Sequence, residues 1–163
     1  MDGNPSVSYN IAVIAIVLSP LIFAMGGNME TGAQGVCIYI VQEKDLASEV
    51  AISPEDNFPE VLATSRVIAL MEISAARLMR PLLKAGQLSV GVSVEINHFA
   101  PTPVGEEVKA VATFLGIEGK IYQFEVEVFD RAGKVANGKH TRAIVVTTRL
   151  VEGARSRMEK AGK

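Results

Sequence analysis

The sequence predicts an α+β domain in which a curved antiparallel sheet wraps around one long central helix. An apolar pattern with helical spacing runs from about Ser65 to Lys84, and β-rich segments lie on both sides of it. After Gly86 the hydrophobic period changes from 3.6 to 2 and keeps that value through four segments. Tight turns separate these segments, so consecutive strands are expected to pair antiparallel and to bury one face on the helix.

The elements follow in order along the chain. Residues 35–41 are β-rich and residues 42–59 are typical of a polar loop. Thr64 stands at the expected N-cap of the helix, and Pro81 and Gly86 mark its end. The four later strands are expected at about 90–98, 106–117, 121–129 and 134–148. In the first of these the alternation places His98 on the helix-facing side, together with Val90, Val92, Val94 and Ile96, and Gly91 on the opposite side.

Length and composition exclude several classes of protein. A chain of 163 residues is one domain by size and can bury a full core. The net charge is -2, there is no Trp, and there are only three Tyr, so neither a basic surface nor a stacking platform for nucleic acid is expected. The single cysteine, Cys37, excludes an internal disulfide and a Cys-based zinc cluster. We expect no metal and no cofactor.

The two ends of the chain differ from its centre. Ile11 to Met25 is almost wholly apolar, but at fifteen residues it is shorter than the roughly 20 that span a membrane. We favour a start codon assigned too early, with Met29 as the true start, and hence a cytoplasmic protein without a membrane partner. A signal peptide, or membrane association through residues 11–25, remains the alternative. Residues 1–35 are therefore treated as an extension, 36–150 as the domain, and 151–163 as a charged tail that we expect to be frayed.

Glu72 is the most informative residue of the helix. It lies one turn after Ile68 and one turn before Ala76, at the edge of the stripe that faces the core. A carboxylate there costs several kcal/mol unless it is paired or hydrated, and catalysis is a common reason to keep one. Together with His98 on the strand and Thr64 at the helix start, it has the chemistry of an acyl-transfer site.

Each of these groups also has a structural explanation. Thr64 alone is most simply an N-cap, and His98 a strand-end histidine bonded to a carbonyl. Glu72 is equally explained as one partner of a structural ion pair. Three residues near the start of the last strand are most simply a solvated end: Lys139, His140 and Arg142. The functional interpretation depends on Thr64, Glu72 and His98 all pointing inward.

Two stretches carry a resemblance to a known family: VLATSRVIALME at 61–72 and VGVSVEINHFAPTPVG at 90–105. They resemble the hot-dog fold thioesterases related to fluoroacetyl-CoA thioesterase, and the likeness extends from about residue 41 to 146. The resemblance implies a hot-dog fold and a catalytic set of Thr64, Glu72 and His98. It also implies a homodimer with sites at the subunit interface.

Further residues are implied by the same resemblance. Gly91 would help to hold the thioester carbonyl, Arg142 would belong to the active-site region, and Phe58 would form part of a lid. Glu55 stands where a second lid phenylalanine is expected, and Ser65 stands where proline is frequent. These two departures bear on fluoroacetyl specificity rather than on thioesterase activity.

The predicted reaction is hydrolysis of an acyl-CoA thioester to free acid and thiol. Glu72 would attack the carbonyl or activate water, and His98 would move the proton. Two other functions remain open at this stage. One is a hot-dog enoyl-CoA hydratase or dehydratase, and the other is a non-catalytic acyl-CoA-binding protein.

Overall fold

The computed structural model describes residues 29–162. The apolar extension predicted at the N-terminus lies mostly in residues 1–28, outside the described part. Within residues 29–162, no helix is both long and apolar enough to cross a membrane. The main elements are β1 (Gln34–Ile40), α1 (Thr64–Met79), β2 (Gln87–His98), β3 (Glu107–Glu118), β4 (Ile121–Asp130), β5 (Gly133–Val146) and α2 (Thr147–Ala161).

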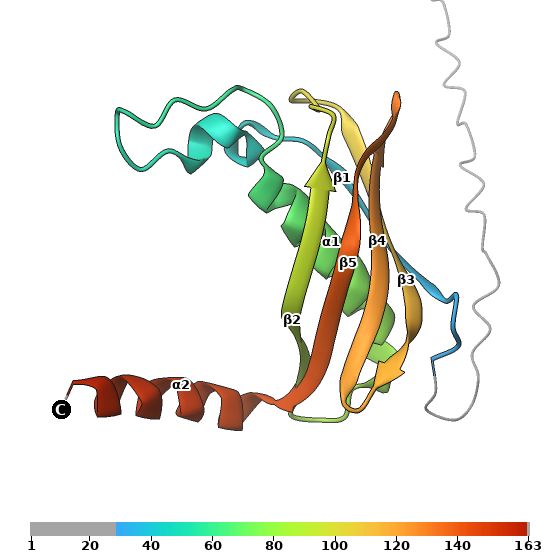
Figure 1. The fold of residues 1–163 in the computed structure, drawn as a ribbon, viewed down its shortest axis with the longest axis vertical. Coiled ribbons are helices and arrows are strands. Elements are labelled where there is room, and N and C mark those ends of the chain that lie inside the picture. The colour runs from blue at the N-terminus through green and yellow to red at the C-terminus, as the bar shows by residue number, and fades with distance from the viewer. Residues whose placement is uncertain (1–28, 163) are drawn as a thin grey trace, which may run out of the picture.

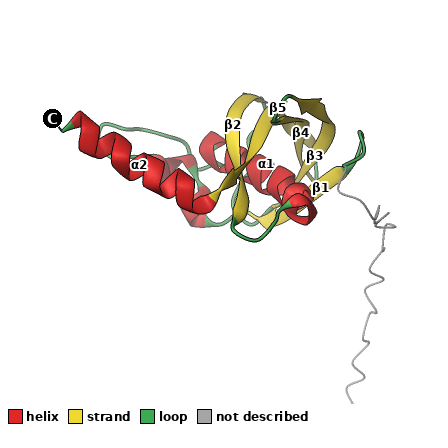
Figure 2. Ribbon diagram, turned by 90° about the horizontal axis from the view of Figure 1, so that it is seen from below, coloured by secondary structure: helices red, strands yellow, loops and turns green. Residues whose placement is uncertain are grey.

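The five strands form one antiparallel sheet in the order β1-β3-β4-β5-β2. The sheet curves around α1, which lies across its concave face (Figures 1 and 2). This arrangement confirms the predicted fold class, an antiparallel sheet wrapped on one central helix. β1 and β2 are the two edge strands, so each has one side without a neighbouring strand among residues 29–162.

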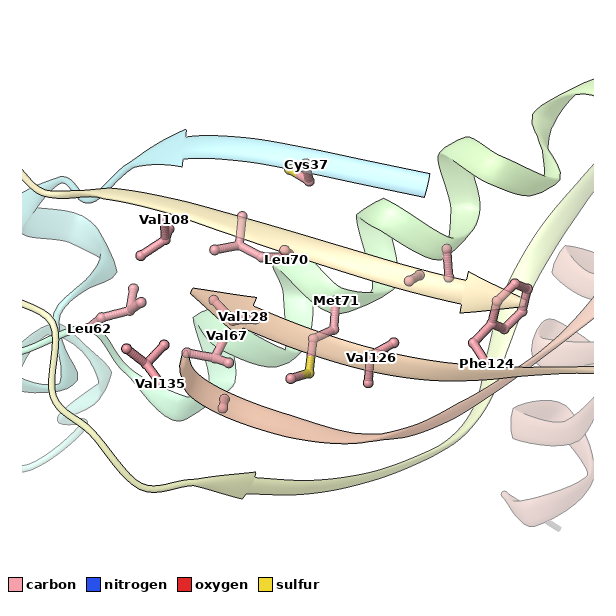
Figure 3. Packing of buried hydrophobic residues seen from close by; sticks show 14 of the residues in the cluster. Cys37, Leu62, Val67, Leu70, Met71, Val108, Phe124, Val126, Val128 and Val135 are labelled. Carbon is pink, nitrogen blue, oxygen red and sulfur yellow. The ribbon is translucent and has the colours of Figure 1, made fainter. Parts of the chain in front are cut away.

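The core lies between α1 and the middle of the sheet. Val67, Leu70 and Met71 of the helix belong to the same buried cluster as Val126 and Phe124 of β4 (Figure 3). The alternation predicted for β3 and β4 is confirmed by the buried residues of both strands: Val108, Ala110, Ala112, Phe114, Phe124, Val126 and Val128. This packing fixes the rotation of α1 about its axis and therefore the direction of Glu72.

The expected pairing of consecutive strands is wrong at one point. β2 does not pair with β3 but with β5, at the far side of the sheet. The connection between β2 and β3 is not a tight turn, because Pro101 and Pro103 keep it extended. This connection passes the start of α1, where the Leu62 N–H donates to the carbonyl of Thr102 over 2.8 Å.

The predicted faces of β2 are wrong over its first half. The pairing of β2 with β5 shifts by one residue between Gly91 and Ser93, which is a β-bulge. The extra residue reverses the alternation of side chains along the strand. Gly91, paired with Arg142, therefore lies on the same helix-facing side as His98, which is paired with Ala136. Val92 is instead 55% exposed.

Both ends of α1, and the end of the chain, also differ from expectation. Ala63 is the N-cap residue, and Thr64 begins the helix without capping it. Pro81 ends the α-helix early, at Met79, and the chain continues as a 3-10 turn over Arg80–Leu82. The tail expected to be frayed forms α2, an exposed helix that projects beyond the β2 edge (Figure 1).

Candidate active site

Thr64 and His98 form a pair at the N-terminal end of α1. The Thr64 Oγ1 lies 3.0 Å from the His98 Nδ1, within hydrogen-bond distance. Thr64 is exposed and His98 is half-buried. The other ring nitrogen, Nε2, is enclosed and has no partner within the described chain. Within residues 29–162, the Thr64 hydroxyl is therefore the hydrogen-bond partner of the His98 ring.

The start of α1 is anchored by a buried carboxylate. Asp45 pairs with Arg66 over 2.5 Å and accepts the Gln42 N–H over 2.9 Å, while its main-chain carbonyl accepts the Ala63 N–H. Burial raises the pKa of Asp45, but the bonds from Gln42, Tyr39 and Arg66 outweigh it, so the pKa lies below its usual value. The charged Asp45 thus holds the helix start, and with it Thr64, in place.

Glu72 lies two turns further along α1, against Gly91 of β2. A Cβ atom on Gly91 would collide with the Glu72 Oε1 and would lie 3.3 Å from both the Glu72 Cδ and the His140 Cε1. Only a glycine lets the carboxylate rest on the strand in this way. Glu72 is half-buried, and no hydrogen bond or ion pair of its carboxylate occurs within residues 29–162.

His140 and Arg142 are buried beside this carboxylate, so the prediction of a solvated strand end is wrong for both. Their exposed fractions are 1% and 5%. Arg142 donates from Nη2 to the Ser89 carbonyl over 2.7 Å, from Nε to the Ser89 Oγ over 3.2 Å, and from Nη1 to the Glu72 main-chain carbonyl over 3.4 Å. The His140 Nδ1 lies 2.7 Å from the carbonyl of Ser93.

Charge and protonation at these two residues are coupled to Glu72. Burial lowers the pKa of His140 more than the hydrogen bond to the Ser93 carbonyl raises it. The positive charge of Arg142 lowers this pKa further, and the charge of Glu72 raises it by less. Burial also lowers the pKa of Arg142, although the negative charge of Glu72 opposes this. His140 is therefore neutral at pH 7, while Arg142 keeps its charge.

These residues form two half-sites within one chain. We call Thr64 and His98 the hydroxyl half-site, and Glu72 and Gly91 with their buried neighbours the carboxylate half-site. Eight residues of α1 separate Thr64 from Glu72, a rise of about 12 Å. Seven residues of β2 separate Gly91 from His98, which is roughly 20 Å. One chain therefore brings together Thr64 with His98, and Glu72 with Gly91 and Arg142, but not the two sets with each other.

The remaining predicted residue, Phe58, lies in the loop before α1 and is 48% exposed. Its role as a lid stays a prediction. Within residues 29–162, no three His, Cys, Asp or Glu side chains are close enough together to hold a metal ion.

Sequence reasoning missed His140 and its contact with the Ser93 carbonyl, and also the hydrogen bonds that Arg142 donates to Ser89. A signal was present, because His140 and Arg142 follow Ala136 at even spacing on one strand and so share its buried face. Their charge made a solvated end the simpler explanation.

A free carboxylate on the central helix, together with an imidazole paired to a hydroxyl, provides the groups for acyl transfer on this fold. Fold and site together define a thioesterase of the hot-dog class. Comparison with known proteins agrees. A sequence model of the family "fluoroacetyl-CoA-specific thioesterase" matches residues 41–148, so the chain belongs to this family. It is a thioester hydrolase that acts on acyl-CoA.

Individual relatives support the assignment. The chain is similar to the fluoroacetyl-CoA thioesterase of Streptantibioticus cattleyicolor, with 36% identity over 94 residues, which are 57% of this chain and 68% of that protein. A crystal structure of the fluoroacetyl-CoA thioesterase FlK superimposes with a TM-score of 0.76 at 29% identity, over 79% of this chain and 97% of the other. A thioesterase superfamily member from Thermus thermophilus shares the fold, with a TM-score of 0.74 at 21% identity, over 83% of this chain and 97% of the other.

Proposed function

We propose that the enzyme works as a homodimer in which the carboxylate half-site of one copy meets the hydroxyl half-site of the other. The observation that carries this proposal is the separation of the two half-sites within one chain. Both half-sites touch the edge strand β2, at Gly91 and at His98, and this edge pairs with no other strand of the described residues. Antiparallel pairing of β2 with its copy would bring the two half-sites together.

The exposed side chains of the edge support the same pairing. Val92 within β2 is 55% exposed, and Phe99, which directly follows the strand, is 57% exposed. An unpaired strand with apolar side chains is normally covered in a stable protein. A two-fold axis would cover both copies with one self-complementary surface.

The register of this pairing follows from the β-bulge. Opposed residues of an antiparallel pair share a face, and Gly91, Val94, Ile96 and His98 all face the helix. If His98 opposes Gly91 of the second copy, Ile96 opposes its Val94, and Glu95 lies on the two-fold axis. The bulge counts as one position in this alignment.

Cysteine cross-linking tests the register. In a dimer of the Glu95→Cys variant, the two Cα atoms at this position would lie about 4.5–5.5 Å apart, which suits a disulfide. We expect a covalent dimer under mild oxidation. The matched control is Ser93→Cys, which should cross-link to Asn97→Cys of a second chain but not to itself. Cross-linking of Ser93→Cys alone, with none for Glu95→Cys, would contradict this register.

The proposed mechanism places the thioester carbonyl between the two half-sites. The Glu72 carboxylate either attacks this carbon, forming a mixed anhydride as the C–S bond breaks, or takes a proton from a water that attacks it. In the first route, a water then attacks the Glu72 carbonyl carbon of the anhydride, which releases the free acid and restores the carboxylate. The leaving thiolate receives a proton from His98, and Thr64 donates a hydrogen bond to the developing oxyanion. These steps use side chains and water, without metal or cofactor. A cytoplasmic location would suit the free, buried thiol of Cys37.

Replacing Glu72 tests the assignment of this carboxylate. Glu72→Gln keeps the shape of the side chain but removes the charge, so we expect turnover to fall at least about a hundredfold with the fold intact. Release of CoA is followed with a thiol reagent, and normal hydrolysis by the variant would refute the assignment. A single turnover in ¹⁸O-water then separates the two routes, because only the anhydride route leaves label in the Glu72 carboxylate.

The acyl group has a candidate position beside the carboxylate half-site. A hollow of about 290 Å³ is lined mainly by apolar side chains, among them Ile73, Ala76, Leu83 and Leu88. It reaches Ser89, whose main-chain carbonyl accepts a hydrogen bond from Arg142. We propose that it receives the acyl chain. Acyl-CoA substrates from acetyl to long-chain would give the preferred length, and Ala76→Leu should shift that preference to shorter chains. An unchanged preference would place the acyl chain elsewhere.

A further inference from the structure

His140 is the buried titratable group that the mechanism above leaves without a role. It lies on β5, almost wholly enclosed, next to the position where Glu72 meets Gly91. Neither ring nitrogen is free, since Nδ1 lies 2.7 Å from the Ser93 carbonyl and Nε2 lies 3.1 Å from the Arg142 Nη1.

These two contacts fix the tautomer of the ring. A main-chain carbonyl can only accept a hydrogen bond, so the Nδ1 of His140 must carry the proton. A guanidinium can only donate, so Nε2 must be the unprotonated acceptor. His140 is therefore held neutral, with a lone pair directed at Arg142.

The same contact helps to determine which groups the Arg142 guanidinium binds. The guanidinium binds Ser89, His140 and the main-chain carbonyl of Glu72, but no Arg142 nitrogen lies within 4.0 Å of a Glu72 carboxylate oxygen. A buried arginine beside a carboxylate ordinarily forms a direct, often bidentate pair. Here the nitrogen nearest to Glu72, Nη1, is occupied by His140 and the carbonyl. The Glu72 carboxylate consequently interacts with the positive charge of Arg142 through space, without a hydrogen bond between them.

We propose that His140 is a positioning residue that keeps Arg142 from pairing with the Glu72 carboxylate, so that this carboxylate stays free to react. The inference rests on the proposed function, in which Glu72 acts on the thioester. Facing Glu72 from the sheet, β5 contributes two titratable groups, His140 and Arg142. The β2 residues around it, Ser89, Gly91 and Ser93, do not titrate.

Three variants of His140 separate its possible roles. His140→Phe fills the space but accepts no hydrogen bond, so Arg142 would turn to Glu72. We expect kcat to fall about tenfold or more with KM nearly unchanged. His140→Gln still reaches Arg142 with an acceptor and should restore most of the activity. His140→Asn still reaches Ser93 but is too short for Arg142, and should not.

A double variant tests whether Arg142 mediates the effect. In an Arg142→Met background no guanidinium can pair with Glu72, so His140→Phe should cause no further loss. An equal loss in both backgrounds would show that His140 only fills space and would overturn the proposal. If His140→Phe does not fold, the contrast between the Gln and Asn variants decides, and equal activity of the two would overturn it. Hydrolysis by Glu72→Gln would instead refute the proposed function itself.

Discussion

Gly91 offers the sharpest test of the site geometry, because one added methyl group reaches the Glu72 carboxylate, which we propose to be the reacting group. An alanine Cβ there would overlap the Glu72 Oε1 and lie 3.3 Å from its Cδ. The Glu72 side chain would have to swing away by about 1 Å or more to restore normal contact. A displacement of that size at a reacting group can cost about a hundredfold in rate.

The same substitution should hardly affect stability. Gly91 does not have a positive φ, so alanine fits its backbone, and the displaced group is the mobile end of a half-buried side chain. We expect the free energy of unfolding, measured in urea, to change by no more than about 1 kcal/mol. Gly153→Ala on α2 is the matched control, since nothing lies within 4 Å of its Cβ, and it should leave kcat unchanged. A Gly91→Ala enzyme with normal kcat and KM would refute the close approach of Glu72 to β2.

Three further predictions follow from the contacts of individual residues. Thr64→Ala should lower kcat about tenfold or more while Thr64→Ser keeps it, because only the hydroxyl bonded to His98 is required; equal loss in both would contradict this. Asp45→Asn should lower the free energy of unfolding by about 1–3 kcal/mol, since Arg66 loses its buried partner; an unchanged urea midpoint would argue against that anchor. The lowered pKa of His140 means that the unfolded chain takes up a proton first as pH falls below 6.5. Stability should therefore be constant above that pH and decrease below it, and His140→Gln should remove this part of the loss, as urea unfolding at pH 8 and pH 5.5 would show.

Much of the fold could be predicted because it depends on local pattern. The alternation on β3 and β4 and the apolar stripe of α1 predicted their buried faces, since both follow from the repeat of each element. The pairing of β2 with β5 joins residues far apart in the sequence. A tight turn is expected after β2 from the sequence, and the resulting prediction that β2 pairs with β3 is wrong. The bulge after Gly91 places the first half of β2 with its faces opposite to those predicted. A single extra residue in a strand leaves no pattern in the sequence from which it could be predicted.

The site was predictable as a set of residue types more than as an arrangement. Thr64, Glu72 and His98 were recognised from their chemistry and from resemblance, but the sequence did not reveal that they fall into two separate pairs. That division depends on where α1 crosses the sheet. The burial of His140 and Arg142 was missed because a charged side chain is expected in solvent unless its partners are known.

The composite site is tested most directly by mixing two inactive variants. Glu72→Gln lacks the carboxylate half-site and His98→Ala lacks the hydroxyl half-site. A dimer with one chain of each kind keeps one complete site if the halves come from different copies. Random exchange of equal amounts should then restore about a quarter of the wild-type activity, because half of the dimers carry one of two sites. No recovery, in a mixture where exchange of subunits is demonstrated, would contradict the shared site.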